Sequence, residues 1–556
     1  MANSGNMLST AVSGLQAFQR NLATIGHNIS NVNTEGFSRQ SVELSARTPN
    51  AVGNGFVGTG VDVTSVTRVY DQFLFDQVTS RNSSFNQFNT LQTMASGIDE
   101  LLSNEDAGLN PAIQGFFNAI QDVANNPTSI PAREVAISEA DTLAARFQSI
   151  DTRLSDLRES TNNQLVSMTS EVTSIAKSVA ELNKDIVLAS GNAGGQPPND
   201  LLDKRDVLIS QLSELVSVST TESQDGTLNV FIGNGQSLVL GSNSSTISTL
   251  PNQFDPTQLD VAFVSGGTTF SIGSQLSGGK LGGLLSFREQ VLDPIQNSLG
   301  RIAIGLASSF NDQHQLGDDI NGNPGGLFFS DILSTSPQAI ASSNNNPASG
   351  TVSVTINDVN QIQASDYRLN FNGATFDLTR ISDNTIVDSG FTVADFPRSV
   401  ASDGITLSLA GGVSAGDSFL IKPVRNGGGD IGVAISSAAN FAAAASGNSL
   451  GDNSNALSLV GLQSQKVLGG STESYQLAYS NLVGQVGVST RESKVNADAQ
   501  NALLTRAVDA QQSLSGVNLD EEAANLVKFQ QAYQAAAQVI RISDEVFQTL
   551  LGVTSR

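Results

Sequence analysis

The chain has 556 residues, a length that predicts about three structural units because single hydrophobic cores stop growing well below it. The net charge is −24 and no run of Lys or Arg occurs, which argues against nucleic acid and against an anionic membrane surface, since both attract clustered positive charge. Because the chain contains no Cys, disulfides, thiolate metal sites and a Cys nucleophile are excluded.

The N-terminal segment has the pattern of a coiled-coil helix. Its apolar residues alternate in steps of three and four, as a seam that faces a partner helix does. An ordinary amphipathic core helix gives a similar stripe, but four consecutive heptads favour the seam. The positions are Leu8, Ala11, Leu15, Phe18, Leu22, Ile25, Ile29 and Val32.

The stretch NISNVNTEGFSRQ, residues 28–40, is expected to end this helix. Its asparagines tolerate turn and left-handed backbone, and Gly36 tolerates more. We therefore expect the chain to turn outward here, with Phe37 packed against the end of the seam. The alternative is a plain loop with an incidental aromatic residue.

Proline placement predicts a long helix in the middle of the chain. No Pro occurs between Pro131 and Pro197, and helix interiors exclude Pro because it removes a hydrogen bond and clashes with the preceding turn. The alternation of three and four recurs there, at Leu165, Met168, Val172, Ile175, Val179, Leu182 and Ile186.

The period then changes to that of strands. TLNVFIGNGQSLVLG, residues 227–241, alternates on both sides of Asn234-Gly235, which predicts a hairpin. Denser alternation predicts a separate antiparallel β unit over roughly 337–437, with helix patterning resuming near Ile435. The alternating runs are Val352/Val354/Ile356, Tyr367/Leu369/Phe371, Phe376/Leu378, Ile405/Leu407/Leu409 and Phe419/Ile421.

Two helices are expected after the last proline, a weaker one over roughly 471–512 and then a strong final one. Acidic residues in the first turn of the final helix favour the positive end of its dipole. Its stripe is Leu519, Leu526, Tyr533, Ile540 and Phe547, interleaved with Phe529, Ala536 and Leu550; Glu522 and Ser543 depart from it.

These patterns predict a multidomain α+β protein. Because both ends carry strong seams, the simplest packing places the ends together. We expect a discontinuous terminal α-helical coiled-coil domain from residues 1–40 and 513–556. A mainly α-helical middle domain with β-hairpins takes 41–336 and 438–512, and an antiparallel β domain, 337–437, is inserted in it.

Two matches to enzyme motifs do not have the context that their chemistry requires. GNGFVG, residues 53–58, fits a dinucleotide fingerprint, yet a turn precedes it and an alternating strand follows instead of a helix. GNSLG, residues 447–451, fits a nucleophile elbow, whose Ser449 needs a histidine base. The chain has only His27 and His314, and the Ala-rich segment before Ser449 is typical of a helix, so we interpret this motif as a loop between helices.

Two acidic segments invite a metal or acid–base interpretation. DINGNP, residues 319–324, imitates a calcium loop, but Pro324 and Ser330 stand where that loop requires Gly and Glu. LDEEAANL, residues 519–526, offers paired carboxylates, but acid–base work needs a dry cleft and a first helical turn is solvated. We therefore expect no catalytic residue, no cofactor and no metal site.

The N-terminus lacks the basic region and continuous apolar core of a cleaved signal peptide. No apolar run approaches the ~18 residues that cross a bilayer. We therefore expect no membrane insertion, and secretion, if it occurs, without a cleaved signal.

Both ends resemble one family. NISNVNTEGFSRQ is similar to the N-terminal signature of the bacterial flagellar axial proteins, the family of rod, hook and hook-associated subunits. SGVNLDEEAANLVKFQQAYQAAAQVIRISDEVFQTLL, residues 515–551, resembles that family's C-terminal helix. GFSRQ at 36–40, the hairpin segment at 226–241 and FNDQHQLGDDINGNPGGLFF at 310–329 are similar to segments of the family's hook–filament junction members. The resemblance is strong over roughly 1–80, 200–330 and 470–556 and weak over the β unit.

The resemblance implies a structural subunit at the junction between hook and filament, without enzymatic activity. It implies export through the flagellar type III apparatus, largely unfolded, with a cytoplasmic export chaperone on the C-terminal helix. Outside the cell, the implied partners are further copies of the chain in a ring, the hook protein and the second hook-associated junction protein.

The expected assembly interface lies on the two seams and the turn after the first. Two seams alone bury too little apolar surface to order both ends, so we expect the ends to be mobile in the free protein and helical in the axial tube. The residues are Leu8, Leu15, Phe18, Leu22, Ile25, Ile29, Val32, Gly36, Phe37, Leu519, Leu526, Phe529, Tyr533, Ile540, Phe547 and Leu550.

Three alternatives stay open. Another axial subunit, a rod or hook protein, is the nearest, although chain length and the segment 310–329 argue against it. An exported adhesin or surface-layer protein would bind a ligand through the β unit and would not need hook ends. A hydrolase using Ser449 would react with a serine-directed fluorophosphonate.

Overall fold

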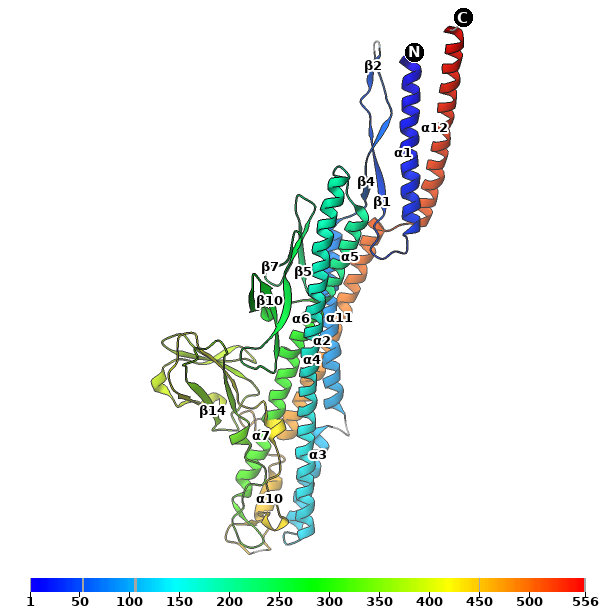
Figure 1. Cartoon of the computed structure of the whole chain (residues 1–556). Coiled ribbons are helices and arrows are strands. Elements are labelled where there is room, and N and C mark those ends of the chain that lie inside the picture. Colours follow the sequence, from blue (N-terminus) through cyan, green and yellow to red (C-terminus); the bar gives the residue numbers. More distant parts are fainter. Residues whose placement is uncertain (1, 53–54, 105–107, 450, 555–556) are drawn as a thin grey trace.

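The two termini lie side by side at one end of an elongated molecule (Figure 1). This computed structural model describes residues 2–52, 55–104, 108–449 and 451–554. Helices and antiparallel sheets alternate along the chain, so the expected α+β class is confirmed. Within the described part of the chain, no helix is both long and apolar enough to cross a membrane.

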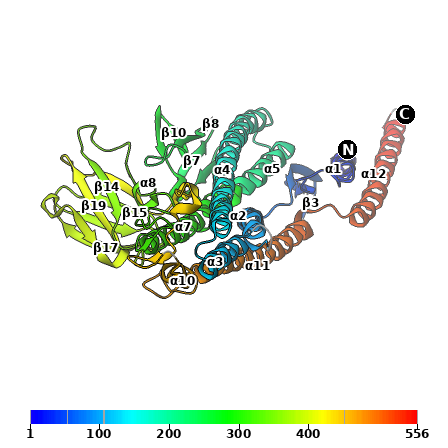
Figure 2. The same ribbon diagram turned by 90° about the horizontal axis from the view of Figure 1, so that it is seen from below.

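The first and last helices form a separate layer at that end. α1 (Ala2–Ser30) and α12 (Leu519–Thr554) run antiparallel, and a long β-hairpin lies along another side of α1 (Figures 1 and 2). Both helices were predicted, whereas only the returning strand of the hairpin was visible as alternation. The hairpin pairs β1 (Gln40–Ala46) with β4 (Val61–Arg68), and β2 (Asn50–Val52) with β3 (Gly55–Val57).

Long helices build the middle of the molecule. Ser129 accepts a hydrogen bond from the Ala132 N–H and Pro131 stands in the first turn, so α4 begins where both residues favour a helix start. α11 packs along α2, and a π-helical stretch, Arg288–Leu292, joins α6 to α7. The helices are α2 (Gln72–Ser103), α3 (Leu109–Asn125), α4 (Ile130–Asn192), α5 (Asn199–Leu215), α6 (Gly279–Phe287), α7 (Asp293–His314) and α11 (Tyr475–Ser515).

Two small sheets cover one side of these helices. The predicted hairpin is confirmed as β6 and β7, and Gly233 and Gly235 between them have positive φ, as a tight turn requires. One sheet has the order β5-β6-β7-β8 and the other β11-β10-β9. The strands are β5 (Val218–Glu222), β6 (Leu228–Ile232), β7 (Gln236–Leu240), β8 (Asn243–Ser244), β9 (Thr246–Pro251), β10 (Leu259–Ser265) and β11 (Thr268–Ser271).

The predicted β unit is an antiparallel pair of sheets that projects sideways from the long helices (Figures 1 and 2). The sheets have the orders β13-β20-β15-β16-β17 and β14-β19-β18. Alternation found β14, β15, β16, β19 and β20, but not the four-residue β13, the bulged β17 or the three-residue β18. The strands are β13 (Gln338–Ala341), β14 (Thr351–Ile356), β15 (Tyr367–Phe371), β16 (Phe376–Arg380), β17 (Thr385–Phe391), β18 (Arg398–Val400), β19 (Ile405–Ala410) and β20 (Ser418–Lys422).

The helix expected near Ile435, which included the Ala-rich segment before Ser449, is wrong. That segment holds a short 3₁₀ turn and the two-residue strand β21, and a helix resumes only at α10. Arg133 donates to the carbonyl oxygens of Ala438 and Phe441, so tertiary partners take the backbone groups that a helix would use. The short elements here are β12 (Gly317–Asp318), α8 (Ile332–Thr335), α9 (Gly427–Asp430), β21 (Ala444–Ala445) and α10 (Ser454–Gly461).

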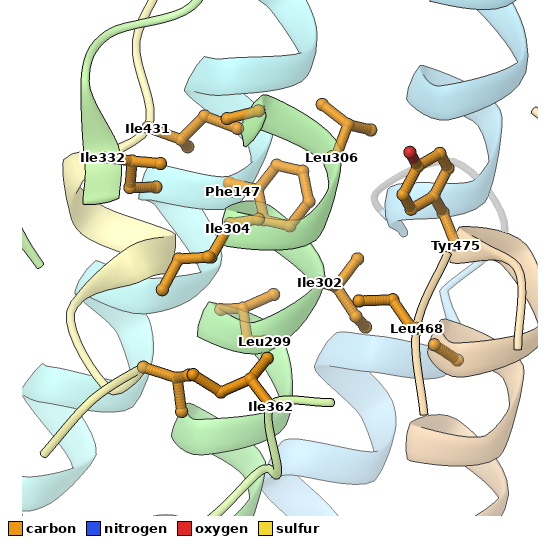
Figure 3. Packing of buried hydrophobic residues seen from close by; sticks show 14 of the residues in the cluster. Phe147, Leu299, Ile302, Ile304, Leu306, Ile332, Ile362, Ile431, Leu468 and Tyr475 are labelled. Carbon is orange, nitrogen blue, oxygen red and sulfur yellow. The ribbon is translucent and has the colours of Figure 1, made fainter. Parts of the chain in front are cut away.

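Two hydrophobic cores hold the middle of the molecule together. One extends from α3, α4, α7 and α11 into the β unit, and the other lies between α4, α5, α6 and the two small sheets. Figure 3 shows Ile302 of α7 on the side of Leu468 and Tyr475, and Ile304 on the other side of α7, near Phe147 of α4. Among the described residues, no side chain of α1 or α12 belongs to either core. The terminal pair is therefore held to the molecule by other contacts.

Candidate assembly interface at the two termini

α1 and α12 meet through their apolar stripes. The rings of Phe18 and Phe529 lie 6.3 Å apart in a tilted arrangement. Ala11 and Ile25, on the same face of α1 as Phe18, are buried. The predicted packing of the two chain ends against one another is thus what the structure contains.

A single copy leaves much of the predicted seam accessible. Ile25 is buried, whereas Leu8, Gly36, Leu519, Leu526 and Phe547 are exposed. The side chain of Leu550 lies outside the described residues. Apolar surface left open along two helices is typical of a further protein contact. The half-buried residues are Leu15, Phe18, Leu22, Ile29, Val32, Phe37, Phe529, Tyr533 and Ile540.

Two polar residues, Asn28 of α1 and Glu522 of α12, contact each other where the helices reach the rest of the molecule. Glu522 is only 3% exposed, which corrects the expectation of a fully solvated acidic turn. The Asn28 Nδ2 donates to the Glu522 carboxylate at 3.2 Å and to the Gln40 carbonyl at 3.0 Å, and the Gln40 N–H donates back to Asn28 Oδ1 at 2.9 Å. A buried carboxylate is tolerated when donors face it, so Asn28 and Glu522 fix one register of the pair.

Asn31 and Asn33 lie in the turn after α1, as expected, whereas Asn28 still lies in the helix. Neither Asn31 nor Asn33 has positive φ, so the left-handed conformation is taken by Gly36 alone in this segment. Gly36 has φ of 73°, and a Cβ there would stand 2.1 Å from Val207 Cγ2 on α5. Glycine is therefore required both for backbone conformation and for space.

Phe37 lies beside the last turn of α1. Its half-buried ring meets the His27 ring edge-on, with centroids 5.4 Å apart. This places Phe37 next to the seam, as expected, while its role in assembly stays a prediction.

Backbone groups of the crossover bind both neighbouring helices. The Ser38 N–H donates to Asp203 of α5 at 3.0 Å, and the Arg39 N–H donates to the carbonyl of Ser515 at the end of α11 at 2.8 Å. Arg39 also forms an ion pair with the exposed Glu521 at 2.8 Å. The outgoing chain from α1 and the incoming chain to α12 are thereby held together.

A buried ion cluster fixes the base of the hairpin to α5. Arg68 of β4 reaches Asp203 at 3.1 Å and Asp206 at 2.5 Å. Burial acts to lower the pKa of Arg68, but the Asp206 carboxylate raises it above its ordinary value, and burial raises the pKa of Asp206. Asp203 therefore binds both segments that cross from the terminal layer to the middle domain.

Ser449 is exposed in a loop between β21 and α10 and not, as expected, between helices, and within the described residues neither histidine is hydrogen-bonded to it. The buried His314 donates from Nδ1 to the Gly326 carbonyl at 2.8 Å and accepts from the Ala442 N–H at Nε2 at 2.9 Å. The His27 ring nitrogens lie 3.3 Å from Asp200 and from the Asn31 amide. Both rings are thus occupied by structural partners.

The remaining motifs form ordinary turns and strands. Of GNGFVG, residues 53–54 lie outside the described residues, Gly55–Val57 is β3, and the strand predicted to follow is confirmed as β4. Asp319 of DINGNP accepts hydrogen bonds from the backbone N–H groups of Asn321 and Asn323, which closes a turn. Within the described ranges, no group of three or more His, Asp or Glu is placed to hold a metal.

Sequence reasoning missed the polar residues of the crossover. Glu522 gave a signal, because an acidic residue at an apolar seam position needs a buried donor. Asp203 and Arg68 gave none, since charged residues on an amphipathic helix or at a strand end are usually solvated. Their pairing depends on tertiary placement alone.

Family models match four segments of this chain. The flagellar hook-associated protein FlgK helical domain matches residues 95–329 and the flagellar hook-associated protein 1 D2-like domain matches 340–423. The flagella basal body rod protein model matches 8–37, and the flagellar basal body rod FlgEFG protein C-terminal model matches 510–553.

Full-length relatives decide the family. Flagellar hook-associated protein 1 of Salmonella typhimurium is 36% identical over 562 residues, which cover 99% of this chain and 100% of the relative. The chain belongs to the flagellar hook-associated protein 1 family. The Escherichia coli protein of the same name is 34% identical over 554 residues, with 99% and 100% covered. A solved structure of the flagellar hook junction protein FlgK from Burkholderia pseudomallei is similar, with a TM-score of 0.74 and 27% identity over 79% of this chain and 100% of that one.

The resemblance seen in the two ends is therefore confirmed. The D2-like match covers the β unit, where the sequence resemblance was weak. The exact domain boundaries proposed from composition stay a prediction.

Proposed function

We propose that this chain is a structural subunit of the bacterial flagellum that forms the junction between hook and filament. The observation that carries the proposal is the end-to-end similarity to proteins named flagellar hook-associated protein 1 and to one described as a flagellar hook junction protein. Because a structural subunit acts through surfaces, its function depends on what the terminal helices and the β unit contact.

Self-assembly through α1 and α12 is the mechanism that this proposal implies. The pair stands outside both cores and leaves Leu8, Leu519 and Phe547 exposed. Burying such side chains stabilises an assembly by about 25 cal/mol for each Å² of apolar surface removed from water. Neighbouring copies can cover this surface. The further partners would be the hook protein on one side of the ring and the second hook-associated junction protein on the other.

Export is proposed to follow the flagellar type III route to the cell exterior. The chain would travel largely unfolded, and a cytoplasmic chaperone would shield the apolar faces of α12 before assembly. The exposed apolar residues of α12 support a need for such shielding, because they would otherwise favour premature association.

A deletion strain tests the proposal. Without the gene, hooks should form, flagellin should leave the cell as monomer and motility should be lost, while the reintroduced chain should restore filaments. Electron microscopy of hooks and immunoblots of medium and cells measure both outcomes. Filaments on the deletion strain would overturn the proposal.

A rod subunit is the second candidate, because the models that match 8–37 and 510–553 carry rod names. The same strain separates the two. Loss of a rod subunit would prevent hooks from forming, whereas loss of a junction subunit would leave hooks that are bare.

A further inference from the structure

The β unit, strands β13 to β20, is joined to the rest of the molecule by two short stretches of chain. The chain enters it through residues 331–337, where α8 contacts β14, and leaves it through residues 423–431. Two bodies joined in this way move relative to one another unless further contacts oppose the motion. The angle between the β unit and the long helices (Figure 1) therefore depends on contacts outside these two connections.

The first such contact comes from the loop 357–366, between β14 and β15. The Asn360 side chain donates to Ser471 Oγ at 2.6 Å and accepts from the Ser471 N–H at 2.7 Å, and the Asn360 carbonyl accepts from the Gly470 N–H at 2.8 Å. Ile362 of the same loop is fully buried in the core that includes α7, and in the view of Figure 3 it lies just below Leu299. We call Asn360 and Ile362 the latch.

The turn that Asn360 binds has an unusual backbone. Gly469, Gly470 and Ser471 all have positive φ, of 59°, 67° and 66°. A serine in this conformation is uncommon and persists only where surrounding contacts impose it, which the two hydrogen bonds from Asn360 do. Because the turn stands immediately before α11, the latch connects the β unit to the start of the helix that leads to the crossover.

The second contact comes from the loop 252–258, between β9 and β10. The Gln253 carbonyl accepts from the Ser343 N–H at 2.7 Å, and the Gln253 side chain accepts from the Asn344 amide at 2.9 Å, both just after β13. Asp255 forms an ion pair at 2.6 Å with Lys422 of β20, whose side chain is only 5% exposed. We call Gln253 and Asp255 the brace.

The brace stands on a loop that is anchored to the helices. Asn162 of α4 donates to the Thr257 carbonyl at 2.8 Å and accepts from the Leu259 N–H at 3.1 Å. Across the base of the loop, the Asn252 amide donates to the Asp260 carboxylate at 2.8 Å. Since the loop is fixed to α4, a turn of the β unit has to break the contacts of the brace.

Arg425 fixes the pivot and not the angle. It lies in the connection that leaves the β unit, where its guanidinium pairs with Asp366 of the loop before β15 and with Asp293 of α7, the latter at 3.1 Å. A contact inside the connection holds the two bodies together there. It opposes a turn about that point less than the latch and the brace, which lie on other segments of the chain.

We propose that the β unit is an arm able to turn as one body about residues 331–337 and 423–431, and that the latch and the brace together set its angle. The angle decides which surface of the β unit is presented beside the long helices. The inference concerns a single copy and goes beyond the proposed function, so it is tested on the purified full-length chain.

The absence of Cys allows labels to be placed at chosen positions. Ser138→Cys on α4 and Thr385→Cys on β17 are both exposed sites, and nitroxide labels there report the angle of the β unit. The distance between the labels is measured by pulsed electron paramagnetic resonance. In the chain with both contacts intact, we expect one narrow distribution of distances.

Removing the two contacts separately and together is the decisive comparison. Gln253→Ala with Asp255→Ala removes the brace, and Asn360→Ala with Ile362→Ala removes the latch. Either pair alone should leave the distribution narrow, because the other contact still opposes the turn. All four substitutions together should broaden it by roughly a factor of two or more, because only the connections then limit the motion.

Two controls separate a turn from a loss of structure. Asn372→Ala is the matched variant, since the Asn372 side chain accepts from the N–H groups of Ala374 and Thr375 within the β unit and touches no helix. It should leave the distribution narrow. A second label pair inside the β unit, Ser353→Cys with Thr385→Cys, should stay narrow in every variant.

Broadening between α4 and β17, with a narrow distribution inside the β unit, is the expected result. An unchanged distribution in the fourfold variant would overturn the inference, because the remaining core would then hold the β unit by itself. Broadening of both label pairs would overturn it as well, since the β unit would then unfold instead of turning as one body. Equal broadening in Asn372→Ala would show that the latch and the brace have no special role.

Discussion

Replacing Gly36 by Ala tests the turn that follows α1. A left-handed backbone costs an L-residue roughly 1–2 kcal/mol. The new Cβ would also stand 2.1 Å from Val207 Cγ2, and overpacking of this kind typically costs roughly 1–3 kcal/mol. We therefore expect Gly36→Ala to lower the free energy that opens the crossover by about 2–5 kcal/mol.

Amide hydrogen exchange at Ser38 and Arg39 measures this change. Their N–H groups donate to Asp203 and to the Ser515 carbonyl, so they exchange only when the crossover opens. Each 1.4 kcal/mol is a factor of ten, so protection should fall by roughly 30-fold to several thousand-fold. The purified chain is compared with and without the substitution under identical conditions.

Two further variants separate the causes. Val207→Ala combined with Gly36→Ala removes the steric conflict and should restore part of the protection, leaving the backbone component. Gly26→Ala, on α1 with no atom within 4 Å of the new Cβ, should instead stabilise the helix by up to about 1 kcal/mol. Unchanged protection of Ser38 and Arg39 in Gly36→Ala would refute the reasoning.

Three other expectations follow from the structure. Asn28→Ala leaves the buried Glu522 carboxylate without its donor and should weaken the pairing of α1 with α12 by roughly 1–3 kcal/mol, which lowers incorporation of the chain into flagella. The added change Glu522→Leu should recover part of the loss, and equal loss in the single and double variants contradicts this. Burial lowers the pKa of His314, so the stability that the neutral ring contributes is complete above about pH 6.5 and is lost as the pH falls. Between pH 7 and 5 the urea midpoint of unfolding should therefore change less in His314→Gln than in the unchanged chain. The same change with pH in both proteins would count against this. Exchange on the free chain should show weak protection along 8–32 and 519–550, and strong protection throughout would disprove mobile ends.

The helices were predictable from sequence because burial repeats along them. The seam at Leu165, Val172 and Val179 is buried in α4, and the two proline-free ends are α1, α11 and α12. Each of these segments is long enough to repeat the 3.6-residue apolar period over several turns, so single exceptions do not hide it. The same holds for the strands with strict alternation, such as β14 and β15.

The errors fall where tertiary hydrogen bonds override local preference. The Ala-rich segment before Ser449 has high helix propensity, but Arg133 binds its carbonyl oxygens and His314 accepts from its Ala442 N–H. Glu522 was expected in solvent, yet it is buried in the seam and accepts a hydrogen bond from Asn28. In each case the decisive partner is distant in sequence, so the local pattern does not identify it, even where, as at Glu522, it indicates that a partner is needed.

The two kinds of contact at the termini have different consequences for assembly. At the crossover, hydrogen bonds of Asn28, Ser38 and Arg39 and the left-handed backbone of Gly36 set where α1 and α12 point relative to α5 and α11. Along α1 and α12, apolar side chains stay partly exposed, and their packing does not fix the direction of the helices. We infer that the orientation of α1 and α12 is fixed within each copy, while most of the free energy that orders these two helices comes from contacts with neighbouring copies. Substitutions at the crossover should therefore misalign copies that still associate, whereas polar substitutions at Leu8, Leu519 or Phe547 should weaken association without misalignment.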